Sequence, residues 1–227
     1  MPIVEVSALD GEEILQAFGQ FCHAIEKGTC DDAMRVLAKL RESCPTFAFS
    51  GFINFQIESG DCPLHLAVAT GDLDKVELVL EWGGYIDMPG KKGKQPIHVA
   101  AELGLDQVVR FLSFQGADID ARDCDHNTPL HLSANNGHLN VVWQFIQLSD
   151  DINSCNAAGK TPTGLALESH HDRSKSLLIA NDGKVSRDSL AIDGDKPWLP
   201  MSISEKLGYE KARYRLCSVL DFGEKKS

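Results

Sequence analysis

The chain lacks long apolar runs, a leader-like N-terminus and paired cysteines. No apolar stretch approaches the ~18 residues of a membrane-spanning helix, so the sequence predicts no membrane insertion. Residues 1–5 contain no basic region followed by an apolar segment, so we expect no secretory signal. The seven cysteines are scattered and form no CxxC pair, which indicates reduced thiols in the cytoplasm or the nucleus.

Basic residues are in the minority. The chain has 22 Lys and Arg against 33 Asp and Glu, a net charge of -11. A phosphate lattice needs a basic face, so this balance argues against direct binding to nucleic acid or to an anionic membrane. It leaves a protein partner with a basic or mixed-charge surface.

Motifs for catalysis and metal binding are also missing. The lysine-rich run 90–94 lacks the spacing of a phosphate-binding loop and its trailing Ser or Thr. The adjacent pairs Cys22-His23 and His170-His171 have the wrong spacing for zinc, and the acidic run 118–125 lacks the glycine and glutamate of a calcium loop. Nothing in the sequence places a cysteine together with an oriented base and an oxyanion pocket. We therefore expect no enzyme activity, metal or cofactor.

What the chain does have is a motif that returns every 33 residues. The four copies are Cys62-Pro63-Leu64-His65, Gln95-Pro96-Ile97-His98, Thr128-Pro129-Leu130-His131 and Thr161-Pro162-Thr163-Gly164. A fixed period of this size indicates stacked supersecondary units in which each unit contacts only its neighbours.

The residues around each motif predict two helices and a turn. Proline suits the first position of a helix, and the preceding threonine suits the N-cap, where Cys62 and Gln95 are poorer. Alanines follow, and then Gly71, Gly104 or Gly137 ends the short helix. A second helix with apolar residues at helical spacing comes next, and a protruding finger closes the unit.

This period and the Thr-Pro-Leu-His motif resemble those of the ankyrin-repeat family. The resemblance implies an all-α solenoid of about six units with β-hairpin fingers. It places an N-terminal capping unit and a long link at 1–59 and four repeats at 60–92, 93–125, 126–158 and 159–182. Residues 183–227 hold a polar insertion and a degenerate C-terminal capping repeat, since the step from Pro162 to Pro200 is 38 residues. Gly164 and His170 depart from the family pattern, so we expect the fourth repeat to be the loosest.

The resemblance also implies structural roles and a function. His65, His98 and His131 are expected to bond the backbone between neighbouring units. Ankyrin repeats bind proteins through finger tips and the concave face of the first helices, which makes a non-catalytic adaptor, scaffold or inhibitor the expected function. The alternative is the targeting domain of a larger enzyme or of a secreted bacterial effector that acts on host proteins. We expect the chain to be monomeric on its own.

The family's variable positions give the candidate partner-binding residues. They are Glu58, Ser59, Asp61, Thr70, Lys91, Lys92, Lys94, Glu102, Leu103, Cys124, Asp125, Asn127, Asn135, Asn136 and Lys160. Trp82, near a finger base, is added as a candidate aromatic hot spot. The alternative is that many of them are merely solvated loop residues. A basic finger (Lys91, Lys92, Lys94) is expected to face an acidic one (Asp118, Asp120, Asp123, Asp125) one repeat away, which would set the register of binding more than its affinity.

Three further residues carry weaker expectations. Trp143 is predicted on the convex back, where it marks either a second interface or packing under a terminal segment. Trp198 is expected to pack in the C-terminal cap. Asn153 occupies the turn position that is hydroxylated in some animal ankyrin proteins, which makes it a candidate modification site by resemblance.

Overall fold

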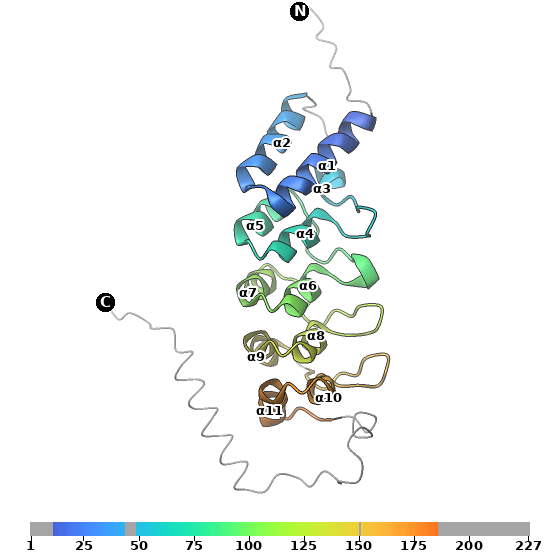
Figure 1. Cartoon of the computed structure of the whole chain (residues 1–227), viewed down its shortest axis with the longest axis vertical. Coiled ribbons are helices and arrows are strands. Elements are labelled where there is room, and N and C mark those ends of the chain that lie inside the picture. The colour runs from blue at the N-terminus through green and yellow to red at the C-terminus, as the bar shows by residue number, and fades with distance from the viewer. Residues whose placement is uncertain (1–10, 44–48, 150, 186–227) are drawn as a thin grey trace, which may run out of the picture.

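The computed structural model describes residues 11–43, 49–149 and 151–185. Within these ranges the chain forms eleven α-helices and one short 3-10 helix, and no residue lies in a β-strand. Ten of the helices form five pairs that stack along one axis (Figure 1). The expected all-α repeat solenoid is therefore confirmed.

The helices fall into two columns (Figure 1). The first helices of the pairs are α1 (Gly11–Lys27), α4 (Pro63–Thr70), α6 (Pro96–Leu103), α8 (Pro129–Asn135) and α10 (Pro162–Glu168). The second helices are α2 (Cys30–Ser43), α5 (Leu73–Glu81), α7 (Asp106–Phe114), α9 (Leu139–Leu148) and α11 (Asp172–Ala180). The short helix α3 (Phe49–Ile53) lies in the link after α2, and the 3-10 helix η1 (Lys91–Gly93) lies in a finger.

The repeated motif sets where the first helices begin and end. Proline occupies the first turn of α4, α6, α8 and α10, as the sequence predicts. The Thr161 hydroxyl accepts a hydrogen bond from the backbone N–H of Gly164 at 3.2 Å. Gly71 and Gly104 end their helices in the left-handed region, with φ of 74° and 73°. Glycine adopts this conformation at little cost, so both predicted helix ends are confirmed.

Three buried histidines join neighbouring units. In each, Nδ1 accepts the N–H of the residue before the motif proline, at 3.2 Å. Because Nδ1 accepts, Nε2 carries the proton and donates to a carbonyl in the next finger. These Nε2–O distances are 2.8, 3.1 and 3.1 Å for His65 to Lys94, His98 to Asn127 and His131 to Lys160. The expected structural role of the histidines is confirmed.

The last described unit departs from this pattern. Gly164 has no imidazole, and here the Thr161 hydroxyl donates directly to the carbonyl oxygen of Lys184 at 2.5 Å. Thr163 and Lys175 replace residues that are apolar and buried in all three preceding units: Leu64, Ile97 and Leu130 for the first, and Val76, Val109 and Val142 for the second. Lys175 is half-buried, as suits a solenoid unit with a more polar outer face, whereas Thr163 is fully buried. The expected sixth unit lies outside the described residues.

A second inter-unit ladder extends the 33-residue register to the N-terminal link. The Asn54 amide donates to Gly83 O at 2.8 Å and accepts from Tyr85 N at 2.7 Å. Asn153, three periods later, makes the equivalent bonds to Asp182 O (3.1 Å) and Lys184 N (2.6 Å). The turn of the N-terminal unit is therefore regular from residue 54 onward. The extra residues of the link must precede it, where α3 lies.

The buried imidazoles predict a loss of stability in mild acid. Burial lowers the pKa of His131 to about 4, and it also lowers the pKa values of His65 and His98. An unfolded chain binds protons at its histidines below about pH 6.5, whereas the folded chain does not until the lower folded pKa is reached. The free energy of unfolding should therefore fall as the pH falls from 6.5 to 4. His131 alone accounts for roughly 3 kcal/mol by the end of that window.

Urea unfolding at about pH 7.5, 6 and 5, followed by circular dichroism, measures this effect. The comparison is His131→Gln, which cannot titrate. We expect the variant to be less stable than the wild type at pH 7.5 but to lose less stability on acidification. Equal slopes for the two proteins would show that His131 is not held neutral by the fold.

Candidate functional site

The fingers are tight turns that lead into the first helices. The same backbone hydrogen bond spans each of them: Ile57 N to Asp61 O, Gly90 N to Lys94 O, Asp123 N to Asn127 O, and Asn156 N to Lys160 O. No residue of these turns lies in a strand, so the expected β-hairpins are present only as turns in the described ranges. All four turns protrude on the same side of the stack (Figure 1).

Neighbouring fingers are bonded to one another. Lys91 N donates to the Asp61 carboxylate at 2.9 Å. Cys124 N donates to Lys92 O, and Ala157 N donates to Asp125 O, both at 2.9 Å. The fingers thus form a connected edge whose backbone is fixed before any partner arrives. A preorganised surface of this kind lowers the ordering cost of binding.

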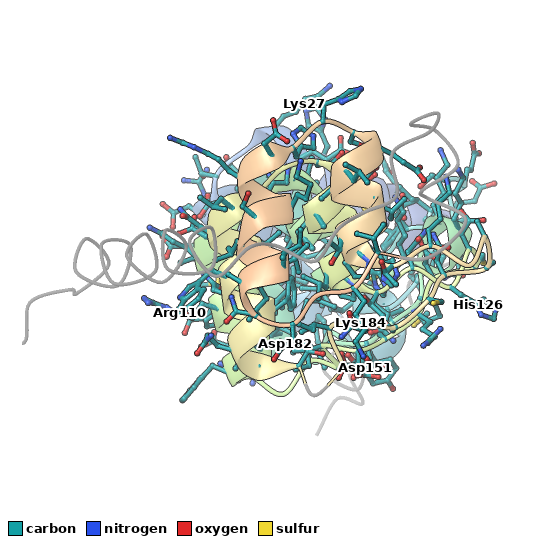
Figure 2. The ribbon with its side chains drawn as sticks, turned by 90° about the horizontal axis from the view of Figure 1, so that it is seen from below. Lys27, Arg110, His126, Asp151, Asp182 and Lys184 are labelled. Carbon is teal, nitrogen blue, oxygen red and sulfur yellow. The ribbon has the colours of Figure 1, made fainter. Side chains whose placement is uncertain are left out.

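Two finger tips hold a side chain in the left-handed region: Lys92, with φ of 57°, in the second finger, and His126 in the third. Gly60, Gly93 and Gly159 occupy the same register position in three fingers, all with positive φ. The third finger has His126 there, with φ of 58°, and its side chain is exposed. A side chain in the left-handed region costs roughly 1–2 kcal/mol. Figure 2 shows His126 at the finger side of the molecule, opposite Arg110.

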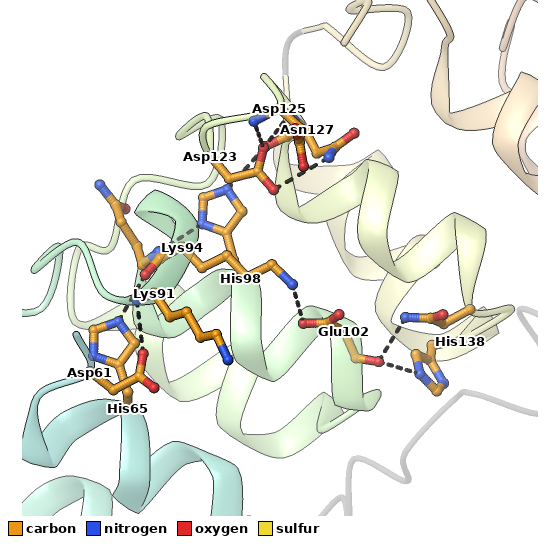
Figure 3. Close-up of polar contacts among 12 residues, drawn as sticks. Asp61, His65, Lys91, Lys94, His98, Glu102, Asp123, Asp125, Asn127 and His138 are labelled. Atoms are coloured by element: carbon orange, nitrogen blue, oxygen red, sulfur yellow. Dashed lines mark hydrogen bonds and ion pairs between the residues drawn. The ribbon is translucent and has the colours of Figure 1, made fainter. Parts of the chain in front are cut away.

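The three lysines of the expected basic finger differ in their surroundings. Lys91 and Lys92 are exposed. The Lys94 ammonium lies 2.6 Å from the Glu102 carboxylate on α6 (Figure 3). An equivalent pair, Lys160 with Glu168 at 2.5 Å, lies two units later. The unit between them has Asn127 and Asn135 at these positions.

The four aspartates of the expected acidic finger do not lie together. Asp123 is buried and accepts hydrogen bonds from the backbone N–H groups of Asp125 and Asn127, at 2.9 and 2.8 Å (Figure 3). Asp118 and Asp120 lie elsewhere, in the turn that follows α7. Asp118 N donates to the Asp87 carboxylate at 3.0 Å. The expectation of four aspartates at one tip is therefore wrong, and Asp125 is the one of the four that is exposed at the third finger tip.

The remaining candidates fall into two groups. Glu58, Ser59, Thr70, Leu103, Cys124 and Asn136 are exposed. Asp61, Asn127 and Asn135 are half-buried and bonded within the stack. Asn136 and His138 both donate to the Glu102 carbonyl oxygen, at 3.0 and 2.8 Å. The concave ends of the first helices are thus joined from unit to unit, as Figure 3 shows for Glu102 and His138.

Neither of the two described tryptophans lies at a finger tip. Trp82 caps α5 and is half-buried, with its ring 5.0 Å from that of Phe49 in an edge-to-face arrangement. It therefore packs α5 against the N-terminal link and is not a finger residue. Trp143 is half-buried on α9, and its role in a second interface stays a prediction. Trp198 lies outside the described residues.

Asn153 is a bridging residue in the turn after α9. Both ends of its amide are bonded to the following turn, to Asp182 O and Lys184 N. Its side chain is half-buried. Hydroxylation of Asn153 stays a prediction.

The described cysteines have no feature of a catalytic thiol. Burial raises the pKa of Cys22 to about 12, and burial also raises the pKa of Cys62. The Cys62 sulfur lies 3.0 Å from His65 Nδ1, but that nitrogen already accepts a backbone N–H, so His65 is committed to the stack. Among the described residues, no cluster of His, Cys, Asp or Glu is arranged to hold a metal ion. In the same ranges, no helix has the length and apolarity to cross a membrane.

Stacked helix pairs with their turns bonded into one edge define a helical repeat solenoid. The family model for ankyrin repeats (3 copies) matches the chain twice, over residues 21–123 and 97–188, which together span more than half of it. The chain belongs to the ankyrin-repeat family. Ankyrin repeats generally mediate protein–protein interaction and are generally not catalytic. No curated protein matches the chain in sequence.

The strain at His126 predicts that glycine is the more stable residue at this tip. Relief of the left-handed side chain should outweigh the greater chain entropy of glycine, so we expect His126→Gly to stabilise the fold by about 0.5–1 kcal/mol. The control is the reverse exchange, Gly159→His, at the same register in the fourth finger. It should destabilise the fold by a similar amount. Urea midpoints of the three proteins test both. A destabilised His126→Gly variant would show that the imidazole makes a compensating contact.

Proposed function

We propose that the chain is a non-catalytic binding module that holds a protein partner along its finger tips and the adjoining ends of the first helices. The observation that carries this proposal is the finger edge itself. Backbone hydrogen bonds connect successive fingers, while Lys91, Lys92 and Asp125 remain exposed on them. A fixed backbone with exposed, variable side chains is suited to recognition.

The distribution of free charge supports a mixed-charge partner. Lys94 and Lys160 are neutralised by glutamates of their own units. The free charges are then basic at the second tip and acidic at the third, one unit apart. Lys92 and Asp125 occupy the same register position with opposite sign. A partner with an acidic group followed by a basic group at this spacing would match the edge, which fixes register and association rate.

An apolar contact is available beside these charges. Leu103, at the end of α6, is 48% exposed and follows Glu102 of the ion pair. Binding energy in protein interfaces is concentrated in a few desolvated contacts, with charged groups around them. We infer that Leu103 supplies such a contact while Lys91, Lys92 and Asp125 orient the partner.

The cellular role that we propose is that of an adaptor, scaffold or inhibitor in the cytoplasm or the nucleus, monomeric when unbound. The alternative is the targeting domain of a larger enzyme or of a secreted effector. The intact mass of the native protein separates the two: a mass well above 24.8 kDa would favour the alternative.

The exposed lysines give the direct test. We expect Lys91→Glu with Lys92→Glu to weaken partner binding about tenfold or more, because both charges at the second tip are reversed. Lys94 is left unchanged so that its bond to Glu102 stays intact. Affinity capture with the full tagged chain, quantified for the wild type and the variant, measures the change.

The matched control is Arg110→Glu with Arg173→Glu. It makes the same change in net charge at two exposed residues of the second helices, on the side opposite the fingers. We expect this control to bind as the wild type does. Equal binding by the finger variant and the wild type would remove the second finger from the interface.

A further inference from the structure

A second surface of different chemistry lies on the turn between α5 and the second finger. A pocket of about 660 Å³ opens there, within the range of roughly 300–1,000 Å³ that is usual for binding pockets. Its wall is mostly apolar, with Gln115 from the next unit, and includes Leu80, Tyr85, Ile86, Met88 and Pro89. Tyr85 is 58% exposed. An exposed apolar patch around a pocket indicates a contact surface.

The next two turns show that the fold does not require an apolar residue here. At the register of Tyr85 they have Asp118 and Asp151. Each of these carboxylates accepts the N–H of the residue two positions later, at 3.1 and 3.0 Å. Tyr85 has no carboxylate with which to make this bond. The apolar wall is therefore specific to the second turn, and it is available for a contact with another molecule.

Carboxylates lead away from the pocket along the turns. Asp87 is the one charged residue among the described residues that line the pocket. Its carboxylate accepts Asp118 N at 3.0 Å, and the carboxylate of Asp118 accepts Asp120 N at 3.1 Å. Asp118 and Asp120 are exposed. A carboxylate has about four acceptor sites, so these side chains can also accept hydrogen bonds from a cationic partner.

Basic groups of the chain do not neutralise these aspartates. Within the described ranges, none of the three is in an ion pair. Lys91 and Lys92 lie on the finger tip, at the other end of the same loop. The Arg122 guanidinium donates to the carbonyl oxygen of Cys155 at 3.0 Å, one unit further along the stack. The surface beside the pocket therefore keeps its negative charge for a partner.

We propose that the pocket binds an apolar side chain of a separate protein, carried in a segment whose neighbouring residues are lysine or arginine. The apolar side chain lies against Tyr85 and Met88, and the basic residues pair with Asp87 and Asp118. Burial of the apolar group supplies the affinity, and the opposite charges set the orientation. The carboxylates repel phosphate groups, so neither nucleic acid nor an anionic membrane suits this surface. The proposal does not rest on the finger edge.

A defined peptide tests this surface. The probe is a synthetic peptide of two lysines, leucine, tryptophan and two lysines. It is titrated into the isotope-labelled full chain, and binding is followed by amide chemical shifts in nuclear magnetic resonance. We expect saturable shifts with this peptide. Absence of saturable shifts would overturn the proposal.

Two matched peptides separate charge from apolar burial. One has glutamates in place of the lysines, and the other has alanines in place of leucine and tryptophan. We expect both to bind more weakly than the first peptide. Equal binding by the glutamate peptide would overturn the charge complementarity, and equal binding by the alanine peptide would overturn the apolar anchor.

Tyr85→Asp separates the pocket from a general attraction between a basic peptide and an acidic chain. It installs the residue that the next two turns carry at this register, so the fold should tolerate it. It also makes the chain more acidic. Because it removes the apolar wall, we expect it to weaken binding of the first peptide about fivefold or more. Attraction by charge alone would leave binding unchanged or strengthen it, and that result would overturn the proposal.

Asp118→Asn tests the charge beside the pocket. Asparagine keeps the oxygen that accepts the Asp120 N–H, so the turn is preserved. We expect binding to weaken about twofold to threefold. The control is Asp31→Asn, the same loss of charge at an exposed residue of α2, which should bind as the wild type does. Figure 2 shows Lys27, four residues before Asp31, at the edge of the molecule opposite Asp151. Equal weakening by both variants would show that the aspartates of the turns are not part of the site.

The finger variant distinguishes this surface from the proposed finger edge. Lys91→Glu with Lys92→Glu removes basic charge from the same loop, so it should bind the basic peptide at least as tightly as the wild type does. Weaker binding by this variant would move the peptide to the finger edge and overturn the proposal.

Discussion

The neutral imidazole that bridges successive units is the interaction on which the stack depends. Each imidazole satisfies two backbone groups at once, the N–H before a first helix and a carbonyl of the next finger. Both would otherwise be buried without a partner, which costs more than a hydrogen bond contributes. The bridge also fixes the height of each finger relative to its neighbour's helix. It therefore determines the spacing at which side chains are presented.

This constraint separates residues that maintain the stack from residues that are free. Lys94 and Lys91 lie three positions apart in one finger, yet Lys94 pairs with Glu102 while Lys91 is exposed. Asp123 and Asp125 divide in the same way: the first bonds the turn and the second points outward. A charged residue on a repeat surface is therefore a candidate for partner binding only when its side chain is not already paired within the stack. The exposed charges that remain are Lys91 and Lys92 on the second finger and Asp125 on the third. The proposed binding edge is based on this pattern.

The 33-residue period was sufficient to predict the helix starts, the glycine ends and the role of the histidines, because these depend on contacts that recur in every unit. The same period also predicts the positions of two residues that the sequence analysis did not name. Asn54 lies 33 residues before Asp87, and His126 lies midway between Gly93 and Gly159, 33 residues from each. Other features could not be predicted. The Lys94–Glu102 pair joins residues eight positions apart in a turn and a helix. Trp82 packs on Phe49, which lies in the link where the period is interrupted.

The apolar turn after α5 and the basic finger tip belong to one loop. Residues 84–89 line a pocket and the basic tip begins at Lys91, so both lie on the connection between α5 and α6. Pro89 is bonded through its carbonyl to Gln56 in the preceding finger, and Gly90 closes the turn on Lys94. These bonds hold the loop in one conformation, which lowers the cost of placing Lys91 and Lys92 on a partner.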